Sequence, residues 1–548
     1  RFRGYTNLYM DDPKHPRARI FTQRKLFDCL TSFSDIEARI SALPTNQERG
    51  DAFEVFAEGY FATQPIAQAK TVWPFEAIPQ PVKERLALGM GRDMGVDGVF
   101  ETRVGEYNAY QVKFRSGRPS LTWDELSTFM GLTDQVTQRV IITNCDDLPS
   151  VINERKGFYC IRGNDLDKLE ARDFEAIQFW LLCKAIPAKR KEPLPHQQEA
   201  LDAVLLALKK HDRATVLMPC GTGKTLLTLW AAEQLGFRKV LVLVPSLALL
   251  RQTLHEWLKE TRWKAFSCLC VCSDPTVARD TDDVVVRQSD VDFPVTTESI
   301  AVRKFLQHGT EGVKVVFSTY QSARVVTEGM GKNKTFELGI FDEAHKTAGR
   351  EGANFSFALK DENLPITRRL FLTATPRHFD VSKRDKEGDA KLVYSMDVPE
   401  VYGLVTYQLS FVEAVKRNII CDYKVIVSVV TSKMVNDELL RCGEVVVEGD
   451  LVRARQVSNQ IALKHAIEAH GVCKVITFHK TVASAASFTS KEGQGLRSHL
   501  PEIEGYHVNG AMPTARREQI MSAFRGAKRA AISNARCLTE GVDVPVVD

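Results

Sequence analysis

The most specific chemical signal in the 548-residue chain is MPCGTGKT, residues 218–225, which lies between an apolar run and a segment with helical patterning. Its glycines let backbone N–H groups fold around phosphate oxygens, and the N-terminus of the following helix adds partial positive charge. Lys224 can reach the outer phosphates of a nucleotide, and Thr225 can hold Mg²⁺. Met218 stands where the usual pattern has its first glycine. We expect ATP and Mg²⁺ to bind through Gly221, Thr222, Gly223, Lys224 and Thr225.

Two carboxylates farther along the chain supply what ATP hydrolysis needs. Asp342 and Glu343 follow an apolar run in FELGIFDEAH, residues 336–345. A carboxylate at the end of a buried strand can hold Mg²⁺ through water, and the next carboxylate can polarise the attacking water. The 118 residues between Lys224 and Asp342 leave room for two strand–helix units. An acidic pair that starts a helix would look similar, but the upstream GTGKT favours ATP hydrolysis.

A second cluster of reactive residue types lies in RDMGVDGVFETRVGEYNAYQVKFR, residues 92–115. Asp97 opens one predicted strand. Gln111 and Lys113 alternate on the next strand and therefore face the same side. A hairpin would bring the three together. Asp97 and Gln111 would then be metal ligands, and Lys113 would stabilise developing charge or orient water at a phosphodiester.

This second cluster leaves alternatives open. Glu54, on a preceding predicted helix, can add another carboxylate. Asp93 competes with Asp97 as the metal-binding acid, and we prefer Asp97 because VDG opens the strand directly. The plain alternative is a surface hairpin whose Asp and Lys are only solvated. The Gln and the order of the surrounding motifs favour a nuclease site.

The elements that must position these residues form an α/β chain. At ~150 residues per domain, the length suggests three or four domains. From residue 197 onward, continuous apolar runs alternate with helical segments, which indicates parallel sheets covered on both faces. Two lobes in series are implied. The runs of the first lobe are RATVLMP (213–219), KVLVLVPS (239–246), VKVVFST (313–319), FELGIFDEAH (336–345) and RLFLTATP (369–376), and those of the second are YKVIVSVV (423–430), CKVITFHK (473–480) and RAAISN (529–534).

The N-terminal third has a different pattern. Residues 1–25 carry seven Lys or Arg against two Asp, so a tail or short docking arm is the default interpretation. A helical region is predicted around 26–65, with Phe53, Phe56 and Phe61 on its apolar face. Strands are predicted at 95–103, 107–114 and 139–144. Residues 184–196, with three prolines, read as a linker to the lobes that follow.

Composition excludes several classes of protein. The formal net charge of +4 argues against a histone-like binder but allows a local basic groove for nucleic acid. No run of about 20 apolar residues predicts a membrane span, and the chain opens with no charged-then-apolar leader. The twelve Cys include no C-x-x-C pair, which suits a reducing cytoplasm. We expect the acidic stretch through Asp280 and Asp292 to be a solvated insertion.

Residues 197–548 resemble the motor of superfamily 2 helicases of the DEAD/DEAH type. The resemblance implies that Gln197 contacts the base, that Gly541 and Asp543 contribute to the nucleotide site from the second lobe, and that His345, Thr373 and Thr375 couple ATP to nucleic acid. The motifs that carry it are LPHQQEALDAV (194–204), GTGKT (221–225), LVPSLALLRQT (243–253), FSTYQSA (317–323), FDEAH (341–345), TAT (373–375), ITFHKTVASA (476–485) and SNARCLTEGVDVP (533–545).

The same resemblance places a final arginine-bearing motif beyond Asp548. Such an arginine supplies the second lobe's arginine finger and can contribute ~10³-fold or more to the rate. We therefore expect these 548 residues alone to bind ATP but to hydrolyse it slowly.

The N-terminal region resembles the PD-(D/E)XK nuclease fold in its Mrr-like form, with Q-x-K in place of E-x-K. RGDAFEVFAEGYF, TVWPF and GVDGV…YQVKF occur in the expected order. Together the two resemblances imply the N-terminal half of a type ISP (type I-like, single-polypeptide) restriction enzyme. The implied domains are an N-terminal arm and helix (1–39), an α/β/α nuclease domain (40–183), a linker (184–196), a first RecA-like lobe (197–400) and an incomplete second lobe (401–548).

We therefore expect an ATP-dependent DNA translocase or helicase coupled to a Mg²⁺-dependent endonuclease, in a prokaryotic restriction or phage-defence system. The alternative is a DNA or RNA helicase whose N-terminal domain binds nucleic acid without cutting. A regulatory protein that uses ATP binding as a switch is a third interpretation. The expected partners are double-stranded DNA and further C-terminal domains, such as a methyltransferase and a target-recognition domain, or partner subunits. The expected compartment is the cytoplasm.

Overall fold

In the computed structural model the chain forms two compact units, residues 1–274 with 287–421 and residues 275–286 with 422–548. No helix among the described residues has the length and apolarity needed to cross a membrane. The described residues are 12–89, 95–185, 190–272, 291–309, 312–331, 334–350, 355–378, 393–422, 424–427, 429–431, 433–434, 451–490, 495–512, 514–535 and 538.

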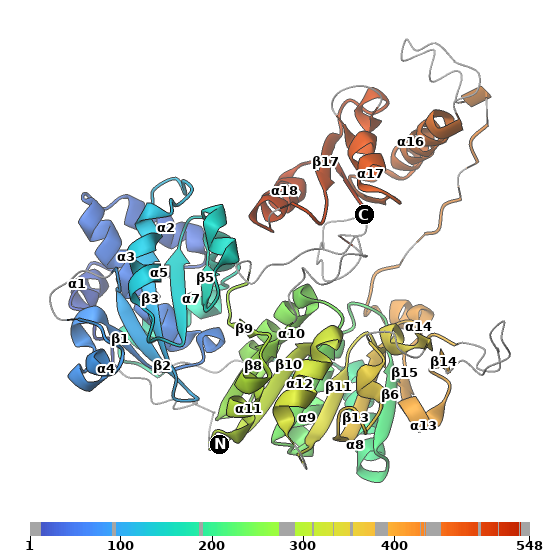
Figure 1. Ribbon diagram of the computed structural model, residues 1–548. Helices are drawn as coiled ribbons and strands as arrows, with labels where there is room; N and C mark the ends of the chain where they lie inside the picture. Colours follow the sequence, from blue (N-terminus) through green and yellow to red (C-terminus); the bar gives the residue numbers. More distant parts are fainter. Residues whose placement is uncertain are drawn as a thin grey trace. The chain divides into compact units, whose positions relative to one another are not determined.

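The first unit begins with a five-stranded mixed sheet of order β1-β2-β3-β4-β5 (Figure 1). Strands β1 to β3 pair antiparallel and β3 to β5 pair parallel. The predicted hairpin is therefore present, as β2 and β3. The strands are β1 (Ala69–Pro74), β2 (Gly98–Thr102), β3 (Tyr107–Lys113), β4 (Gln138–Thr143) and β5 (Phe158–Ile161).

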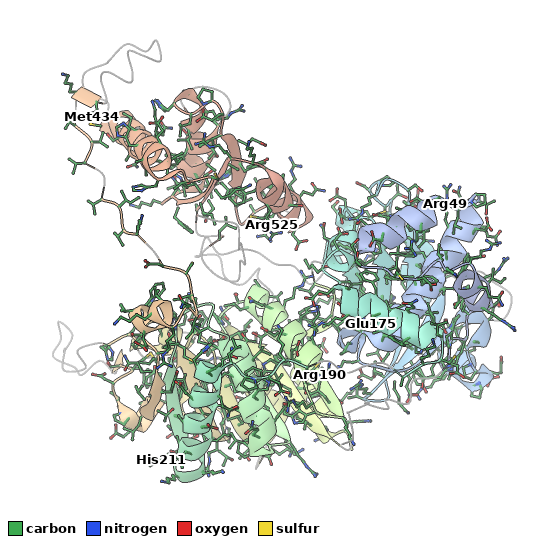
Figure 2. The ribbon with its side chains drawn as sticks, turned by 180° about the vertical axis from the view of Figure 1, so that it is seen from behind. Arg49, Glu175, Arg190, His211, Met434 and Arg525 are labelled. Carbon is green, nitrogen blue, oxygen red and sulfur yellow. The ribbon has the colours of Figure 1, made fainter. Side chains whose placement is uncertain are left out.

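Helices pack on both faces of this sheet, which gives the expected α/β/α arrangement. On one face, Phe61 of α3 lies against Phe100 and Tyr110, with ring centroids 5.0 and 4.8 Å away. On the other face, Phe129 of α5 shares a core with Val99. Arg49 and Glu175 mark α3 and α7 in Figure 2. The helices are α1 (Ala18–Gln23), α2 (Phe33–Ser41), α3 (Asn46–Thr63), α4 (Gln80–Arg85), α5 (Asp124–Leu132), α6 (Gly163–Leu166) and α7 (Ala171–Leu181).

The rest of the first unit is an eight-stranded sheet of order β15-β6-β13-β11-β7-β10-β8-β9, with every pair parallel. Its apolar strands are covered by helices, as continuous Val/Leu/Ile/Phe runs require (Figure 1). The strands are β6 (Arg213–Leu217), β7 (Lys239–Val244), β8 (Phe266–Val271), β9 (Val295–Thr296), β10 (Val313–Thr319), β11 (Phe336–Phe341), β13 (Ile366–Thr373) and β15 (Leu404–Gln408). The helices are α8 (Pro195–Lys210), α9 (Lys224–Leu235), α10 (Leu247–Glu260), α11 (Ser299–Gln307), α12 (Ala323–Met330), α13 (Pro399–Tyr402) and α14 (Phe411–Lys416), and a small ribbon pairs β12 (Gly349–Arg350) with β14 (Val393–Tyr394).

Two expectations about the lobe boundary need correction. Strand β15 pairs with β6, so the first lobe's sheet continues past residue 400 and the first unit extends to Cys421. Tyr402 is fully buried against Phe371 (5.1 Å between ring centroids), which ties this segment to the first lobe. The strand expected at 423–430 is not formed by the described residues of that stretch, and Val425 and Val427 are exposed there.

The second unit contains a three-stranded parallel sheet of order β16-β18-β17. Val508, Phe524 and Ile532 are fully buried in its core. Residues Gly541 and Asp543, expected to contribute to the nucleotide site, lie outside the described residues. The elements are α16 (Leu451–His470), β16 (Lys474–Phe478), α17 (Val482–Thr489), β17 (Glu504–Val508), α18 (Thr514–Gly526) and β18 (Ala530–Asn534).

Within the first unit, α10 joins the eight-stranded sheet to the N-terminal domain through buried ion pairs. Arg251 of α10 pairs with Asp165 of α6 and with Asp292 (3.1 Å). His255 also pairs with Asp292 (2.9 Å). Burial opposes ionisation of Asp292, but the charges of His255 and Arg251 outweigh it and hold the pKa below its usual value. The expectation that Asp292 is solvated is therefore wrong, since it is 3% exposed.

Glu260, at the end of α10, forms a second ionic contact. It is 1% exposed and accepts hydrogen bonds from Arg172 Nη1 of α7 (2.8 Å) and from Lys191 N (2.7 Å). Close by, Arg190, labelled in Figure 2, donates to the carbonyl of Lys259 (2.9 Å). These contacts tie the segment after residue 189 and the N-terminal domain to the same helix end.

Replacing Glu260 with Gln is expected to lower the first thermal unfolding transition of the protein by roughly 5 °C. The charge-assisted hydrogen bonds to Arg172 and Lys191 would be weakened at a buried position, at a cost of about 2 kcal/mol. Differential scanning calorimetry measures this. Glu192→Gln is the matched control, because Glu192 is 76% exposed in its pair with Arg262 and should leave the transition within about 1 °C. Equal melting of wild type and Glu260→Gln would refute the prediction.

Candidate active sites

The predicted phosphate-binding loop joins β6 to α9. Gly221 and Gly223 have φ of +79° and +85°, values that favour glycine. A Cβ on Gly223 would also lie 2.1 Å from Gln197 Nε2, so a larger residue here would displace the Gln197 side chain from the loop. Lys224 opens α9, and its Nζ contacts the carbonyls of Met218 (3.3 Å) and Pro219 (3.4 Å) across the loop. The loop thus presents backbone N–H groups and an ammonium at a helix N-terminus, which is an anion-binding arrangement.

Asp342 and Glu343 follow β11 and face this loop. Glu343 Oε1 lies 4.0 Å from Lys224 Nζ. Glu343 also has φ of +48°, a strained value for a non-glycine residue and one that clusters at functional sites. Burial, and then the neighbouring Glu343 carboxylate, raise the pKa of Asp342 to about 6. The two neighbouring carboxylates suit a divalent cation. The charge of such a cation would favour the ionised form of Asp342.

Two residues that sequence reasoning did not select support this site. Tyr320, in the FSTYQSA segment, is 1% exposed and donates its hydroxyl to the carbonyl of Asp342 (2.7 Å). Trp257 of α10 donates its indole N–H to the carbonyl of Thr225 (3.1 Å). Both contacts cross more than 20 residues of sequence, and no local pattern reports them. Thr225 is therefore tied to the helix that also holds the N-terminal domain.

Gln197 takes a position at the phosphate-binding loop. Its Nε2 donates to the carbonyl of Thr222 (3.1 Å), and its Oε1 accepts from Leu194 N (2.9 Å). His196 Nε2 also lies 3.0 Å from the Thr222 carbonyl. Thr222 itself is buried and donates its hydroxyl to the Pro219 carbonyl (2.7 Å). The structure thus gives Gln197 a part in holding the loop, and its contact with the base stays a prediction.

The three residues expected to couple ATP to nucleic acid lie together. His345 Nδ1 is 2.9 Å from Thr373 Oγ1 and 3.4 Å from Glu343 Oε2. Thr375 N donates to Thr373 Oγ1 (3.1 Å). A chain of polar contacts therefore runs from the Glu343 carboxylate, expected to activate water, to the TAT segment at the end of β13. Such a chain can carry a change at the ATP site to a neighbouring element.

Replacing Thr373 with Val is expected to reduce the stimulation of ATP hydrolysis by duplex DNA about tenfold while ATP binding is unchanged. The substitution keeps the shape but removes the hydroxyl that meets His345 and Thr375, and tenfold corresponds to about 1.4 kcal/mol of coupling. ATPase rates with and without DNA measure it. Thr347→Val is the matched control, because the buried Thr347 hydroxyl contacts Ala344 and Tyr402 instead. Equal stimulation in both variants would contradict the role assigned to Thr373.

In the N-terminal domain, the hairpin brings Asp97 to β3. Val112 N donates to Asp97 Oδ2 (2.6 Å), so the carboxylate lies beside the backbone between Gln111 and Lys113. Gly98 permits this approach, because a Cβ there would lie 2.2 Å from the ring of Tyr110. Lys113 ends β3 and is half-buried. The structure therefore brings together Asp97 and the Gln-x-Lys strand, as the spacing predicts. Asp93, the competing acid, lies outside the described residues.

The side chain of Gln111 is suited to a metal ligand. It is 2% exposed, and its Oε1 has no hydrogen-bond partner among the described residues. A buried amide oxygen without a partner costs free energy that a bound cation would recover. Asp97 and Gln111 would hold such a cation by oxygen atoms, which Mg²⁺ prefers. Within the described part of the chain, no three His, Cys, Asp or Glu residues form a metal-binding group, so a cation here would depend on the Gln111 amide.

Glu54 lies on α3 close to the same strand. Burial, and then the carboxylates of Glu58, Asp97 and Glu54, raise the pKa of Tyr110 well above its usual value. Glu54 and Glu58 lie four residues apart on α3, whose Phe61 packs against Tyr110 of β3 (4.8 Å between ring centroids). Sequence reasoning selected Glu54 and Asp97 but missed Glu58, which is fully buried. The sequence did contain a signal for Glu58: it lies four residues after Glu54 and therefore on the same face of the predicted helix.

Known protein families match both parts of the chain. Residues 190–378 match the family model described as Type III restriction enzyme, res subunit, and residues 63–157 match the one described as Restriction endonuclease. The chain thus resembles a restriction endonuclease domain followed by the res subunit of a restriction enzyme. Both matched families are enzymes. The first match contains Lys224 and Asp342, and the second contains Asp97 and Gln111.

The relatives that the chain matches are longer than the chain. The DNA-bound structure of the ATP-dependent type ISP restriction-modification enzyme LlaBIII is 25% identical, with a TM-score of 0.75 over 95% of this chain and 35% of that one. A nuclease-deletion mutant of the type ISP enzyme LlaGI is 25% identical, with a TM-score of 0.46 over 62% of this chain and 25% of that one. A probable helicase of African swine fever virus is 27% identical over 357 residues, 64% of this chain and 36% of the viral protein. The chain thus spans between a quarter and about a third of the length of these relatives.

Proposed function

We propose that this chain is the nuclease and motor portion of an ATP-driven, DNA-cutting restriction enzyme. The observation that carries the proposal is the presence of two separately built sites on one chain. Lys224 and Glu343 lie 4.0 Å apart at a phosphate-binding loop, and Asp97 lies on the strand that carries Gln111 and Lys113. Double-stranded DNA is the proposed substrate, in a prokaryotic cytoplasm and in a phage-defence role.

In the motor, the loop N–H groups and Lys224 bind the phosphates, and Glu343 accepts a proton from the attacking water. Mg²⁺ held by Thr225 and Asp342 would neutralise charge that develops on the transferred phosphoryl group. His345 and Thr373 relay the state of the site to the DNA-binding segments. Repeated cycles of this kind move the protein along the duplex.

In the nuclease, Asp97 and Gln111 would hold a divalent cation at the scissile phosphate. Lys113 stabilises charge on that phosphate or orients the attacking water. One such site cuts one strand. A double-strand break therefore needs two molecules or two events.

The test uses the full-length protein, a long plasmid substrate and Mg²⁺, with ATP or with a non-hydrolysable analogue. We expect DNA-stimulated ATP hydrolysis, displacement of a triplex-forming oligonucleotide ahead of the motor, and cleavage only when ATP is hydrolysed. Cleavage at the same rate with the analogue would overturn the coupling of motor and nuclease. An absence of DNA-stimulated hydrolysis would overturn the motor itself.

One observation favours a second candidate, a helicase whose N-terminal domain binds DNA without cutting it. The described residues supply Asp97 and the Gln111 amide on one hairpin, but no three-residue group of His, Cys, Asp or Glu that would hold a metal alone. Wild-type protein that moves on DNA but never nicks it would establish this second function.

A further inference from the structure

Lys14 and His15 lie in the basic N-terminal segment that was expected to be a tail or a docking arm, and both are bound to α3. The backbone N–H groups of Lys14 and His15 donate to the two carboxylate oxygens of Glu58, at 2.7 and 3.1 Å. Glu58 is fully buried. Lys14 Nζ donates to the carbonyl of Val72 (3.1 Å) and lies 5.7 Å from the ring centre of Trp73. The arm is therefore held by its backbone, which binds the buried Glu58 carboxylate, and by the side chain of Lys14.

This attachment places the imidazole of His15 against Glu54. Arg17 N donates to His15 Nδ1 (3.2 Å), so Nδ1 is the acceptor nitrogen and Nε2 carries the proton. His15 Nε2 then donates to Glu54 Oε2 at 3.1 Å. The His15 side chain is 8% exposed, whereas that of Glu54 is 31% exposed. The ring is thus fixed on one side by the arm and presents its N–H to the carboxylate on the other.

Glu54 needs such a partner if it is to act in the nuclease site. A Glu side chain loses rotamer entropy when it is fixed in one orientation. Glu54 lies on α3, whose Phe61 packs against Tyr110, the neighbour of Gln111 on β3. Asp51 on the same helix pairs with Arg17 (3.5 Å). His15 therefore acts on the one acidic residue of this helix face that the sequence assigns to catalysis.

We propose that His15 is a positioning residue of the nuclease, and that the backbone of the arm holds it in place. His15 Nε2–H holds the Glu54 carboxylate in the orientation it needs beside the cation that Asp97 and Gln111 would bind. Donors that orient a ligand in this way typically contribute 10- to 100-fold to metal affinity or activity. The proposal deepens the proposed nuclease function and depends on it.

The test compares three variants of the full-length protein. His15→Leu removes the donor, His15→Gln places an amide N–H near the position of Nε2, and Arg17→Gln changes the same arm at a side chain that is 47% exposed and contacts Asp51. Plasmid nicking, DNA-stimulated ATP hydrolysis and Mn²⁺ binding by electron paramagnetic resonance are measured for each. Asp97→Ala defines the Mn²⁺ signal that belongs to this site.

We expect His15→Leu to slow nicking 10- to 100-fold and to weaken Mn²⁺ binding at the Asp97-dependent site about tenfold. We expect His15→Gln to recover most of both, Arg17→Gln to stay within twofold of wild type, and ATP hydrolysis to be unchanged throughout. Wild-type nicking and Mn²⁺ affinity in His15→Leu would overturn the proposal. Equal impairment in all three variants would also overturn it, because the arm would then act only through folding.

These readouts separate the proposal from the proposed nuclease function. If wild type binds Mn²⁺ through Asp97 but does not nick DNA, the nuclease function fails, and unchanged Mn²⁺ affinity in His15→Leu would still overturn the role of His15. If wild type binds no Mn²⁺ that depends on Asp97, both the nuclease function and the role of His15 are overturned.

Discussion

Replacement of Glu343 with Gln is expected to lower DNA-stimulated ATP hydrolysis by about 10³-fold while ATP binding stays near wild type. Glu343 lies 4.0 Å from Lys224 and 3.4 Å from His345, and its pKa is set by opposing influences. Burial raises it, but the hydrogen bond from His345 and the charge of Lys224 outweigh burial and hold the pKa below its usual value. The carboxylate is therefore ionised at neutral pH and can accept a proton from water, a role typically worth 10²- to 10⁴-fold.

The variant isolates that role because Gln keeps the shape of Glu343 and can still accept a hydrogen bond. Initial rates of phosphate release from the full-length protein on duplex DNA measure the loss, and binding of a fluorescent ATP analogue measures the unaffected step. Glu337→Gln is the matched control. It makes the same chemical change on β11, the strand that precedes Glu343, at a half-buried residue that accepts from Lys239 N (2.9 Å). This variant should hydrolyse ATP within twofold of wild type. A Glu343→Gln enzyme within tenfold of wild type would show that another group activates the water.

The sequence was sufficient for the features that local chemistry dictates. A glycine-rich loop between an apolar strand and a helix has few structural solutions, and Gly221 and Gly223 adopt the positive φ that the motif requires. The alternation of Gln111 and Lys113 also placed them on one side of β3, because side chains on a strand alternate strictly. Both inferences use only neighbours in sequence.

The contacts that sequence reasoning missed join residues far apart in the chain. His15 and Glu54 are 39 residues apart, and Trp257 and Thr225 are 32 apart. The interpretation of Asp292 failed for the same reason. A run of acidic residues predicts solvent exposure on average, but Arg251 and His255 of a distant helix stabilise this one in a buried place. Composition cannot reveal which member of an acidic run meets a cation.

The boundary between the lobes was misplaced because a sequence pattern can indicate that a segment is a strand but not which strand it pairs with. LVTYQ, residues 404–408, forms β15 and pairs with β6, nearly 200 residues earlier. The apolar alternation of 423–430 is typical of a strand, yet its described residues pair with none. A strand is stabilised by its neighbours, and a periodic pattern alone does not name them.

Replacement of Asp97 with Asn is expected to lower DNA cleavage by about 10³-fold and to leave DNA-stimulated ATP hydrolysis unchanged. Asn keeps an oxygen that can accept the hydrogen bond from Val112 N, so the hairpin geometry should survive. What is lost is the negative charge that a divalent cation requires. Because Gln111 offers only a neutral oxygen, Asp97 supplies the charge of this pair of ligands, and its removal should exceed the 10- to 100-fold loss typical of outer-shell residues.

Nicking of supercoiled plasmid and phosphate release, measured in the same reaction, separate the two activities. Asp134→Asn is the matched control, because its side chain is 75% exposed in a pair with Arg139 of the same domain, and it should cut at the wild-type rate. Lys113→Ala should reproduce the loss of cutting without weakening Mn²⁺ binding, since Lys113 acts on the phosphate and not on the cation. If Asp97→Asn still nicks DNA within tenfold of wild type, the cation is held elsewhere in the domain. A parallel loss of ATP hydrolysis would instead mean that the substitution disturbs the motor, which the contacts of Asp97 with its own hairpin do not predict.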